Sequence, residues 1–452
     1  MGLAPADTGR PRVTEPIGGG GFRRLIGNSA WLFSANAAAL GLGFLQMLIL
    51  ARVLGPKPYG LLALVMTYPA TVNQVFDSRA WEAATTYLVR YRAEGNAAKA
   101  AAVAKLCYLV DASTALIALV VVLVTAPWAA RVFLKDASLS TLVMAFGITI
   151  LAGVPAGTSL VLLRVAGRFR LVALQNLLNA SLRFVAVLTA LFVVGTLQAV
   201  VAAYVLAMLA GSVVSVWMGR IGARAVGLGG LRSIVAARLD LLRGDGRGIA
   251  RFLTITNVNG LLKVAQRQGD ILLVGYVLGP AAAGFIRLAR SFSDLLNVPV
   301  APVYETSYPT FASLWRHRHL AELRRLARRV TQSSAGFGLV GALALVLGGG
   351  TLLRLSAGAA YGPATVPLQL FAIATGLAVS TSVWHPLLVA MDRPGRSLLA
   401  MASGVTVQLA VLLASVSSLG ASAAGVAYLA FYLTWIPIVG LTLLSVHRHV
   451  RV

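Results

Sequence analysis

The sequence predicts an all-α polytopic membrane protein that crosses the bilayer about twelve times. Hydrophobic residues make up 58% of its 452 residues and charged residues only 12%, and the mean hydropathy is +0.81. A soluble globular chain is much less apolar. Long apolar runs alternate with short charged or Gly/Pro-rich segments, and the second half of the chain repeats a motif of the first. Together these features predict two six-helix lobes related by a parallel internal repeat.

The individual transmembrane helices are expected wherever an apolar run reaches about 20 residues, the length that crosses the hydrocarbon core of a bilayer. Such runs lie at residues 29–51, 59–78, 106–127, 139–163, 171–195, 198–218, 252–277, 281–303, 332–353, 365–390, 397–418 and 421–445. The second, seventh and eighth runs are the least apolar of this set.

The distribution of basic residues predicts the orientation of these helices. The chain has 39 Lys and Arg residues and only 14 Asp and Glu residues. In a soluble protein this excess would suggest a nucleic-acid partner, but the cytoplasmic loops of membrane proteins are rich in Lys and Arg, and we expect no nucleic acid here. The loops expected on the outer side hold these basic residues: Arg52, Lys57, Arg131, Lys135 and Arg354. The segments expected on the inner side together hold most of the Lys and Arg residues, so both termini are predicted to be cytoplasmic.

Polar segments set the expected domain boundaries. The prediction is a disordered cytoplasmic tail (1–22), an N-terminal lobe (23–219), a basic cytoplasmic linker (220–250), a C-terminal lobe (251–446) and a cytoplasmic end (447–452). Within the linker, residues 235–243 have the pattern of an amphipathic helix on the inner leaflet. Residues 314–330 form a second basic segment. Both segments are expected to attract anionic membrane lipids.

A repeated motif supports the division into two lobes. The sequence Val-Leu-Gly-Pro ends at Pro56 in the first half and at Pro280 in the second, and a glycine follows four residues later in each copy, Gly60 and Gly284. Proline cannot continue a helix and glycine permits a tight reversal. The motif is therefore expected to form the first helical hairpin of each lobe, with both lobes in the same orientation.

The first hairpin, Ala51-Arg-Val-Leu-Gly-Pro-Lys-Pro-Tyr-Gly60, resembles the opening of the polysaccharide-export (Wzx-type oligosaccharide) flippases. These belong to the multidrug/oligosaccharidyl-lipid/polysaccharide exporter superfamily, together with multidrug extruders and the lipid II flippase. The resemblance implies a multi-pass protein of the bacterial cytoplasmic membrane. It also implies alternating access and a lipid-linked anionic glycan, a polyprenyl-diphosphate-linked oligosaccharide, as the transported partner.

Ionisable residues inside the expected spans are candidates for the functional site, because a charge in the bilayer is costly. Two sets each occupy one helical face: Lys263, Arg267 and Asp270 in the seventh run, and Arg287, Arg290 and Asp294 in the eighth. The two runs are joined by a short turn and are expected to be antiparallel neighbours. Their charged faces either pair with each other or line an aqueous cavity between the lobes.

The surplus of cations in these faces favours an anionic cargo. The two sets contain more cations than anions, and Arg183 in the fifth run adds another cation. Arginine offers a planar, bidentate donor to phosphate oxygens. The hypothesis is that Arg183, Lys263, Arg267, Arg287 and Arg290 receive a diphosphate; the alternative is that they are structural ion pairs or groups that reach the membrane surface.

The acidic residues Asp111, Asp270 and Asp294 are candidates for charge pairing or for coupling to a proton or sodium ion. Asp111 is the most isolated of them, in an otherwise apolar run. No phosphate-binding loop, cofactor motif or metal-ligand spacing is present, and the chain has one cysteine, so neither a cofactor nor an enzyme activity is expected.

Two alternative classes remain open. A cation-coupled multidrug or small-molecule extruder of the same superfamily would suit an acid-lined cavity, which the basic surplus disfavours. A membrane-embedded glycosyltransferase would need long outer loops with catalytic carboxylates, and every outer loop expected here is short.

Overall fold

The computed structural model of the chain describes residues 19–449. Within this range the side chains of residues 19–33, 250–252, 254–260, 263, 305–306 and 446–449 are not described. The predicted tail (1–22) therefore lies mostly outside the described residues, and the predicted cytoplasmic end (447–452) lies partly outside them.

Long helices follow one another through the first half of the chain. They are α1 (Gly19–Leu54), α2 (Pro56–Phe76), α3 (Ala80–Ala93), α4 (Ala97–Ala129), α5 (Ser140–Gly147), α6 (Thr149–Val165), α7 (Phe169–Val193) and α8 (Leu197–Ala225). A π-helical turn, η1 (Ala130–Leu134), extends α4, and the short 3-10 turn η2 (Ala137–Leu139) precedes α5.

The second half begins with short elements in the linker and continues with long helices. They are α9 (Leu231–Ala236), η3 (Leu239–Leu242), α10 (Gly246–Leu278), α11 (Pro280–Asp294), η4 (Leu295–Asn297), α12 (Ala301–Arg316), α13 (Leu320–Ala357), η5 (Ala359–Ala364), α14 (Thr365–Ser380), α15 (Trp384–Ala390), α16 (Pro394–Leu419) and α17 (Ser422–His449).

Nine helical stretches of the described chain are long and apolar enough to cross a membrane. The three expected spans that do not qualify lie in α2, α10 and the α11–α12 pair, which are also the least apolar in sequence. Two of them, α10 and the α11–α12 pair, carry the two charged faces, and these charges lower their hydropathy.

Three of the expected spans are each divided into two helices. Pro299 lies between α11 and α12 and Pro302 is the second residue of α12, and neither has a backbone N–H to continue the helical hydrogen bonds of α11. At the two other breaks a threonine hydroxyl bonds a nearby main-chain carbonyl: Thr149 donates to Phe146 at 2.6 Å and Thr381 donates to Leu377 at 2.8 Å. Such bonds compete with the regular helical pattern.

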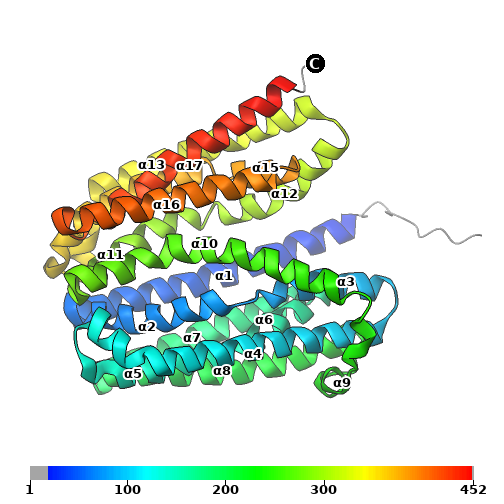
Figure 1. The fold of residues 1–452 in the computed structure, drawn as a ribbon, viewed down its shortest axis with the longest axis horizontal. Helices are drawn as coiled ribbons and strands as arrows, with labels where there is room; N and C mark the ends of the chain where they lie inside the picture. Colours follow the sequence, from blue (N-terminus) through cyan, green and yellow to red (C-terminus); the bar gives the residue numbers. More distant parts are fainter. Residues whose placement is uncertain (1–18, 450–452) are drawn as a thin grey trace, which may run out of the picture.

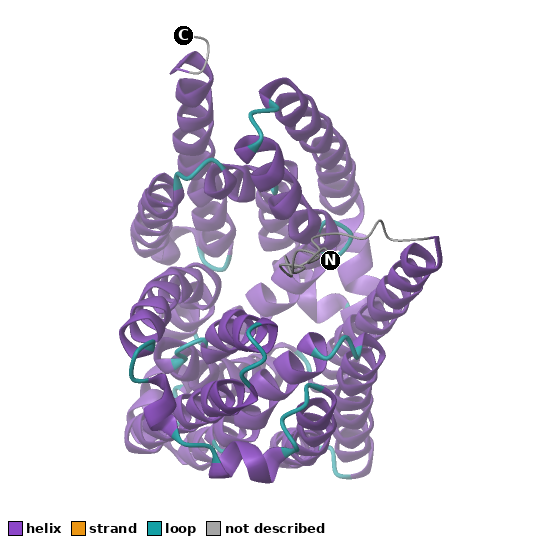
Figure 2. Ribbon diagram, turned by 90° about the vertical axis from the view of Figure 1, so that its right-hand side faces the viewer, coloured by secondary structure: helices purple, strands orange, loops and turns teal. Residues whose placement is uncertain are grey.

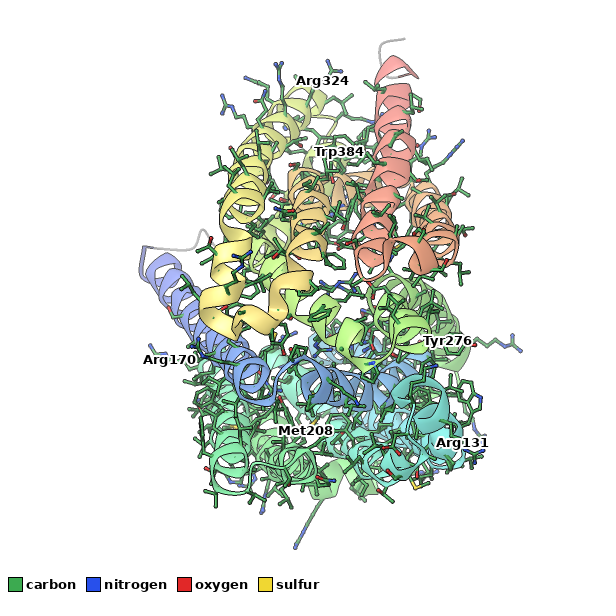
Figure 3. The ribbon with its side chains drawn as sticks, turned by 90° about the vertical axis from the view of Figure 1, so that its left-hand side faces the viewer. Arg131, Arg170, Met208, Tyr276, Arg324 and Trp384 are labelled. Atoms are coloured by element: carbon green, nitrogen blue, oxygen red, sulfur yellow. The ribbon has the colours of Figure 1, made fainter. Side chains whose placement is uncertain are left out.

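The helices form two bundles that lie close together at one end and diverge toward the other (Figure 1). Figures 2 and 3 look along the long axis from the two ends, and in both views the two bundles lie one above the other. We call the closed end the hairpin end, because it contains the repeated motif, and the other the open end. The buried core has the same distribution. One large cluster at the hairpin end contains residues from both bundles, such as Leu62 and Tyr361, whereas separate clusters fill each bundle toward the open end.

The repeated motif makes the closest contact between the bundles. Gly55 and Gly279 have φ angles of 76° and 89°, so both hairpins turn through the same left-handed glycine conformation. A Cβ built on Gly60 would lie 1.7 Å from the carbonyl oxygen of Pro280, and one built on Gly284 would lie 2.7 Å from that of Pro56. The backbones of α2 and α11 therefore touch, and only glycine fits at these two positions.

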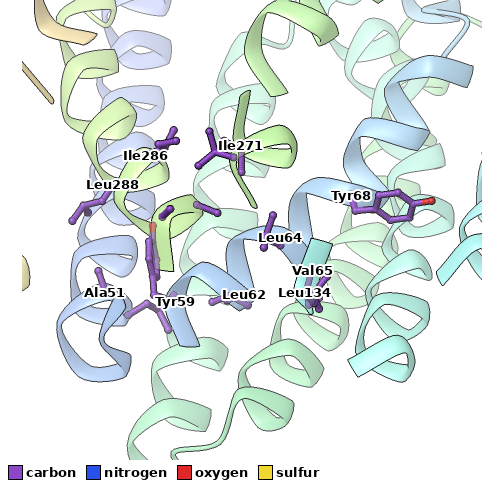
Figure 4. Packing of buried hydrophobic residues seen from close by; sticks show 14 of the residues in the cluster. Ala51, Tyr59, Leu62, Leu64, Val65, Tyr68, Leu134, Ile271, Ile286 and Leu288 are labelled. Atoms are coloured by element: carbon purple, nitrogen blue, oxygen red, sulfur yellow. The ribbon is translucent and has the colours of Figure 1, made fainter. Parts of the chain in front are cut away.

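Other residues of the first hairpin seal the same end. The Arg52 side chain donates to the carbonyl of Leu355 at 2.5 Å, and the Tyr361 hydroxyl donates to the carbonyl of Ala51 at 3.1 Å. The Tyr59 and Tyr361 rings meet edge-on with centroids 6.3 Å apart. Figure 4 shows Ala51 and Tyr59 in the same buried cluster as Ile286 and Leu288 of α11. The hairpin that carries the family resemblance is therefore the surface on which the bundles close.

The linker differs from the expected amphipathic helix over residues 235–243. α9 ends at Ala236, two extended residues follow, and η3 is a single 3-10 turn. Ile234 and Leu242 are only 2% and 4% exposed and belong to the core of the N-terminal bundle. The expectation of one amphipathic helix was wrong, because the chain is extended between α9 and η3. Leu242 packs on the protein, whereas Val235, Leu239 and Leu241 stay exposed.

The start of α10 is tied to the N-terminal bundle. Asp245 accepts a hydrogen bond from the Tyr91 hydroxyl at 2.7 Å and one from Lys99 Nζ at 3.2 Å. These two bonds lower the pKa of the Asp245 carboxyl below its usual value. α10 also packs on α2 and α16, so this helix contacts both bundles along its length.

Replacing Gly60 by Ala should open the hairpin end. The added methyl group overlaps the backbone of Pro280 and should cost the closed state about 1–3 kcal/mol. Spin labels at Lys57→Cys and Ala359→Cys, in a Cys107→Ser background, should then give longer distances by double electron–electron resonance. Gly41→Ala is the control, since a Cβ built there meets nothing within 4 Å. Unchanged distances in the Gly60→Ala protein would refute the role of this contact.

Candidate functional site

A cavity of about 370 Å³ lies between the bundles, immediately inside the sealed hairpin end. Its walls come from α1, α2, α7, α8 and α11, and from the residues that follow α11. Residues on these walls include Gly43, Gln46, Tyr59, Met66, Arg183, Tyr204, Arg287, Ser291 and Asp294. Tyr59 of the seal contributes to the cavity, so the same hairpin closes the passage and lines it.

Two cations from opposite bundles line this cavity. Arg183 extends from α7, and an added Cβ on Gly43 would lie 3.8 Å from its Nη2 atom, so the guanidinium lies against α1. Arg287 extends from α11 and its Nη1 atom donates to the Thr67 hydroxyl at 3.4 Å. Both side chains are half-buried. Asp294 is the one acidic residue among the described lining residues, so the cavity carries a net positive charge.

Neutral polar groups cover the wall formed by the N-terminal bundle. The buried amide of Gln46 donates to the Tyr204 hydroxyl at 2.7 Å. A cleft of about 450 Å³ adjoins the cavity and shares Arg183 with it. Asn36 and Asn176 line this cleft, and their side chains are joined by a 2.9 Å hydrogen bond. These residues were not among the sequence candidates, because a neutral amide or phenol within an apolar run gives no charge signal.

Arg267 and Asp294 form an exposed ion pair beside the cavity. Arg267 Nη2 lies 3.6 Å from Asp294 Oδ1, with 61% and 38% of the two side chains exposed. Arg267 does not itself line the cavity. The pair is solvated enough to open at small cost, so either partner is free to exchange for another charged group.

Arg290 and Asp270 are an internal ion pair rather than part of the cavity wall. Arg290 Nη1 donates to Asp270 Oδ1 at 3.0 Å, and the side chains are 10% and 0% exposed. The guanidinium also stacks on Phe371 and Tyr428, with 4.8 Å and 5.0 Å from its carbon to the ring centroids. Arg290 therefore lies outside the cavity wall in this structure, because its side of the helix points into the C-terminal bundle.

The remaining candidates lie elsewhere. Asp111 is half-buried inside the N-terminal bundle, and a Cβ built on Gly157 of α6 would lie 3.7 Å from its Oδ2 atom. It does not line the cavity. The side chain of Lys263 is outside the described residues. Among the described residues no cluster of His, Cys, Asp or Glu has the geometry of a metal site.

The two-bundle fold, with a cavity between the bundles, is similar to the folds of solved transporters. A multidrug resistance MATE family transporter of the MOP superfamily, in an inward-facing conformation, superimposes with a TM-score of 0.71 at 14% identity, over 91% of this chain and 95% of the other. The lipid II flippase MurJ, in an inward closed conformation, gives a TM-score of 0.66 at 13% identity, over 90% of this chain and 86% of MurJ.

The chain belongs to the family described as "Polysaccharide biosynthesis protein", which matches residues 25–315. A curated relative, inner membrane protein YghQ of Escherichia coli (strain K12), is 25% identical over 354 residues, covering 76% of this chain and 95% of the relative. The chain is thus a multi-pass membrane protein with a transporter fold, and the resemblance first seen in one hairpin extends over most of its length.

Replacing Arg290 by Met should destabilise the protein, because Asp270 would be left as an unpaired buried charge. Breaking a buried pair in this way costs about 3–5 kcal/mol. Thermal unfolding of the purified protein in detergent should show a clear loss. The double variant Asp270→Leu/Arg290→Met removes both charges and should recover much of the stability. Equal stability of Arg290→Met and the parent protein would contradict the structural assignment.

Proposed function

We propose that this protein flips a polyprenyl-diphosphate-linked oligosaccharide from the inner to the outer leaflet of the cytoplasmic membrane by alternating access. The observation that carries the proposal is the pair Arg183 and Arg287, which face one cavity from the two bundles. A diphosphate has oxygens for both guanidinium groups, and each arginine can bind in bidentate fashion.

The remainder of the cavity suits the rest of such a cargo. Gln46, Tyr204 and the adjoining Asn36 and Asn176 offer amide and hydroxyl groups, which are suitable partners for sugar hydroxyls. The polyprenyl chain would stay in the surrounding lipid, because moving an apolar chain from lipid into the cavity would not lower its free energy.

Cargo bound by both arginines also offers a mechanism for the conformational change. A ligand shifts an equilibrium only when it binds one state better than the other. A diphosphate held from both bundles favours a state in which they approach at the open end. Because the bundles cannot be tight at both ends, the contact of Gly60 with Pro280 would then open.

Ion coupling is part of the proposal. Asp294 borders the cavity and is paired with exposed Arg267, so cargo phosphate could replace it as the partner of this arginine. Asp111 inside the N-terminal bundle is the candidate for binding a proton or sodium ion. On this proposal the open end and both termini face the cytoplasm, an orientation that the basic bias of the loops favours.

A cation-coupled extruder of drugs is the second candidate, favoured by the fold similarity to a MATE transporter. The net charge of the cavity distinguishes the glycan flippase from the drug extruder. An anionic cargo needs Arg183 and Arg287, whereas a cationic drug would bind better without them. Flipping of defined polyprenyl-diphosphate glycans in proteoliposomes, compared with efflux of cationic dyes in the same vesicles, tests the proposal directly.

Changing Arg183 or Arg287 to Gln should slow glycan flipping about tenfold or more, since each substitution removes a charged hydrogen bond to phosphate. Thermal stability should stay near that of the parent, because neither arginine has an ion-pair partner among the described residues. Arg131→Gln, at an exposed site outside the cavity, is the matched control. Flipping at the parental rate in both cavity variants would reject a diphosphate cargo.

A further inference from the structure

A second hollow lies on the C-terminal bundle, near the open end and away from the substrate cavity. It has a volume of about 430 Å³ and is bordered by α12, α13, α15 and α17. Its lining includes Leu323, Ala327, Trp384, Leu387, Met391 and Leu443. We call it the α13–α17 groove. In Figure 3 Trp384 and Arg324 both lie in the C-terminal bundle, and Arg324 lies on the side of this bundle that faces away from the N-terminal bundle. The arginine edge of the groove is therefore on the outside of the two-bundle structure.

Two basic side chains border the groove. Arg324 and Arg328 lie one turn apart on α13 and both are exposed. Neither makes a hydrogen bond or an ion pair with any residue that the structure describes. The groove thus combines an apolar floor with two unengaged guanidinium groups at its edge. Trp315 lines the groove together with Trp384. Tryptophan is typical of the membrane–water boundary.

The N-terminal bundle has an equivalent hollow, because the two bundles are internal repeats. It is bordered by α4, α6 and α8, the counterparts of α13, α14–α15 and α17. Here a segment of the chain itself, α9, forms a further wall. Leu231, Ile234 and Val235 of α9 lie against the hollow, and Ile234 is 2% exposed.

The basic residue at the edge is also repeated. Lys105 lies eight residues after the start of α4 at Ala97, and Arg328 lies eight residues after the start of α13 at Leu320. Lys105 Nζ donates to the main-chain carbonyl of Ala237, just after α9, at 2.9 Å. In the N-terminal bundle an apolar segment therefore covers one side of the hollow, and an oxygen atom next to that segment accepts a hydrogen bond from the cation.

We propose that a phospholipid with an anionic headgroup occupies the α13–α17 groove, where no segment of the described chain takes the place that α9 has beside the N-terminal hollow. One acyl chain lies against Leu323, Leu387 and Met391, and the phosphate binds Arg324 and Arg328, as the Ala237 carbonyl binds Lys105. The lipid comes from the leaflet at the open end, which the basic loops predict to be cytoplasmic. This site is separate from the substrate cavity and does not depend on the proposed cargo.

The test is native mass spectrometry of protein released from vesicles of equal phosphatidylglycerol and phosphatidylethanolamine. The parent should retain phosphatidylglycerol in preference to phosphatidylethanolamine. Arg324→Gln/Arg328→Gln should reduce the retained phosphatidylglycerol by about tenfold or more. The matched control is Arg325→Gln/Arg329→Gln, which removes the same charge from the same helix at residues that do not line the groove; it should retain the lipid.

A second variant tests the apolar part of the site. Ala327→Trp fills the groove while leaving both arginines in place, and it should also lose the lipid at unchanged thermal stability. Equal retention by the Arg324/Arg328 and Arg325/Arg329 variants would overturn the proposal, as would equal retention of the two lipids by the parent. Retention by Ala327→Trp at the parental level would overturn the placement of the acyl chain.

Discussion

The contact between the backbones of α2 and α11 at Gly60 and Gly284 is the constraint on which the rest of this structure depends. With no side chain between them, the two helices approach until the main-chain atoms touch, and this joins the bundles into one core at the hairpin end. Tyr59 lines the cavity at its hairpin end. Because the bundles meet at this end and diverge toward the other, the cavity lies between their diverging parts.

Helix packing determines whether a charged residue of the membrane region is buried in an ion pair or lines the cavity. Arg290 and Asp270 are excluded from water, and each compensates the desolvation of the other. Arg183 and Arg287 instead keep partial access to a cavity and have no carboxylate opposite them among the described pairs. A buried pair stabilises one arrangement of helices, whereas a half-exposed cation is available to a ligand.

The internal repeat is informative where it is imperfect. Both bundles have a hollow between equivalent helices with a basic residue at the edge. In the N-terminal bundle α9 of the linker covers one side of the hollow, and Lys105 donates to a carbonyl just after α9. In the C-terminal bundle no described segment takes this place, and Arg324 and Arg328 at the edge have no partner among the described residues.

The sequence by itself determined the helical class, the positions of the long helices, the paired hairpins and the family resemblance, because these depend on apolar length and on glycine and proline, which are local properties. It named Arg183 and Arg287 among five candidate cations. Only the tertiary structure decided that Arg290 is buried while Arg287, one turn earlier on α11, faces the cavity. The side of a helix that meets water is set by its rotation against its neighbours, and adjacent residues differ by about 100° in that rotation. Neutral groups such as Gln46 were found only in three dimensions, since their role comes from the partner that packing brings to them.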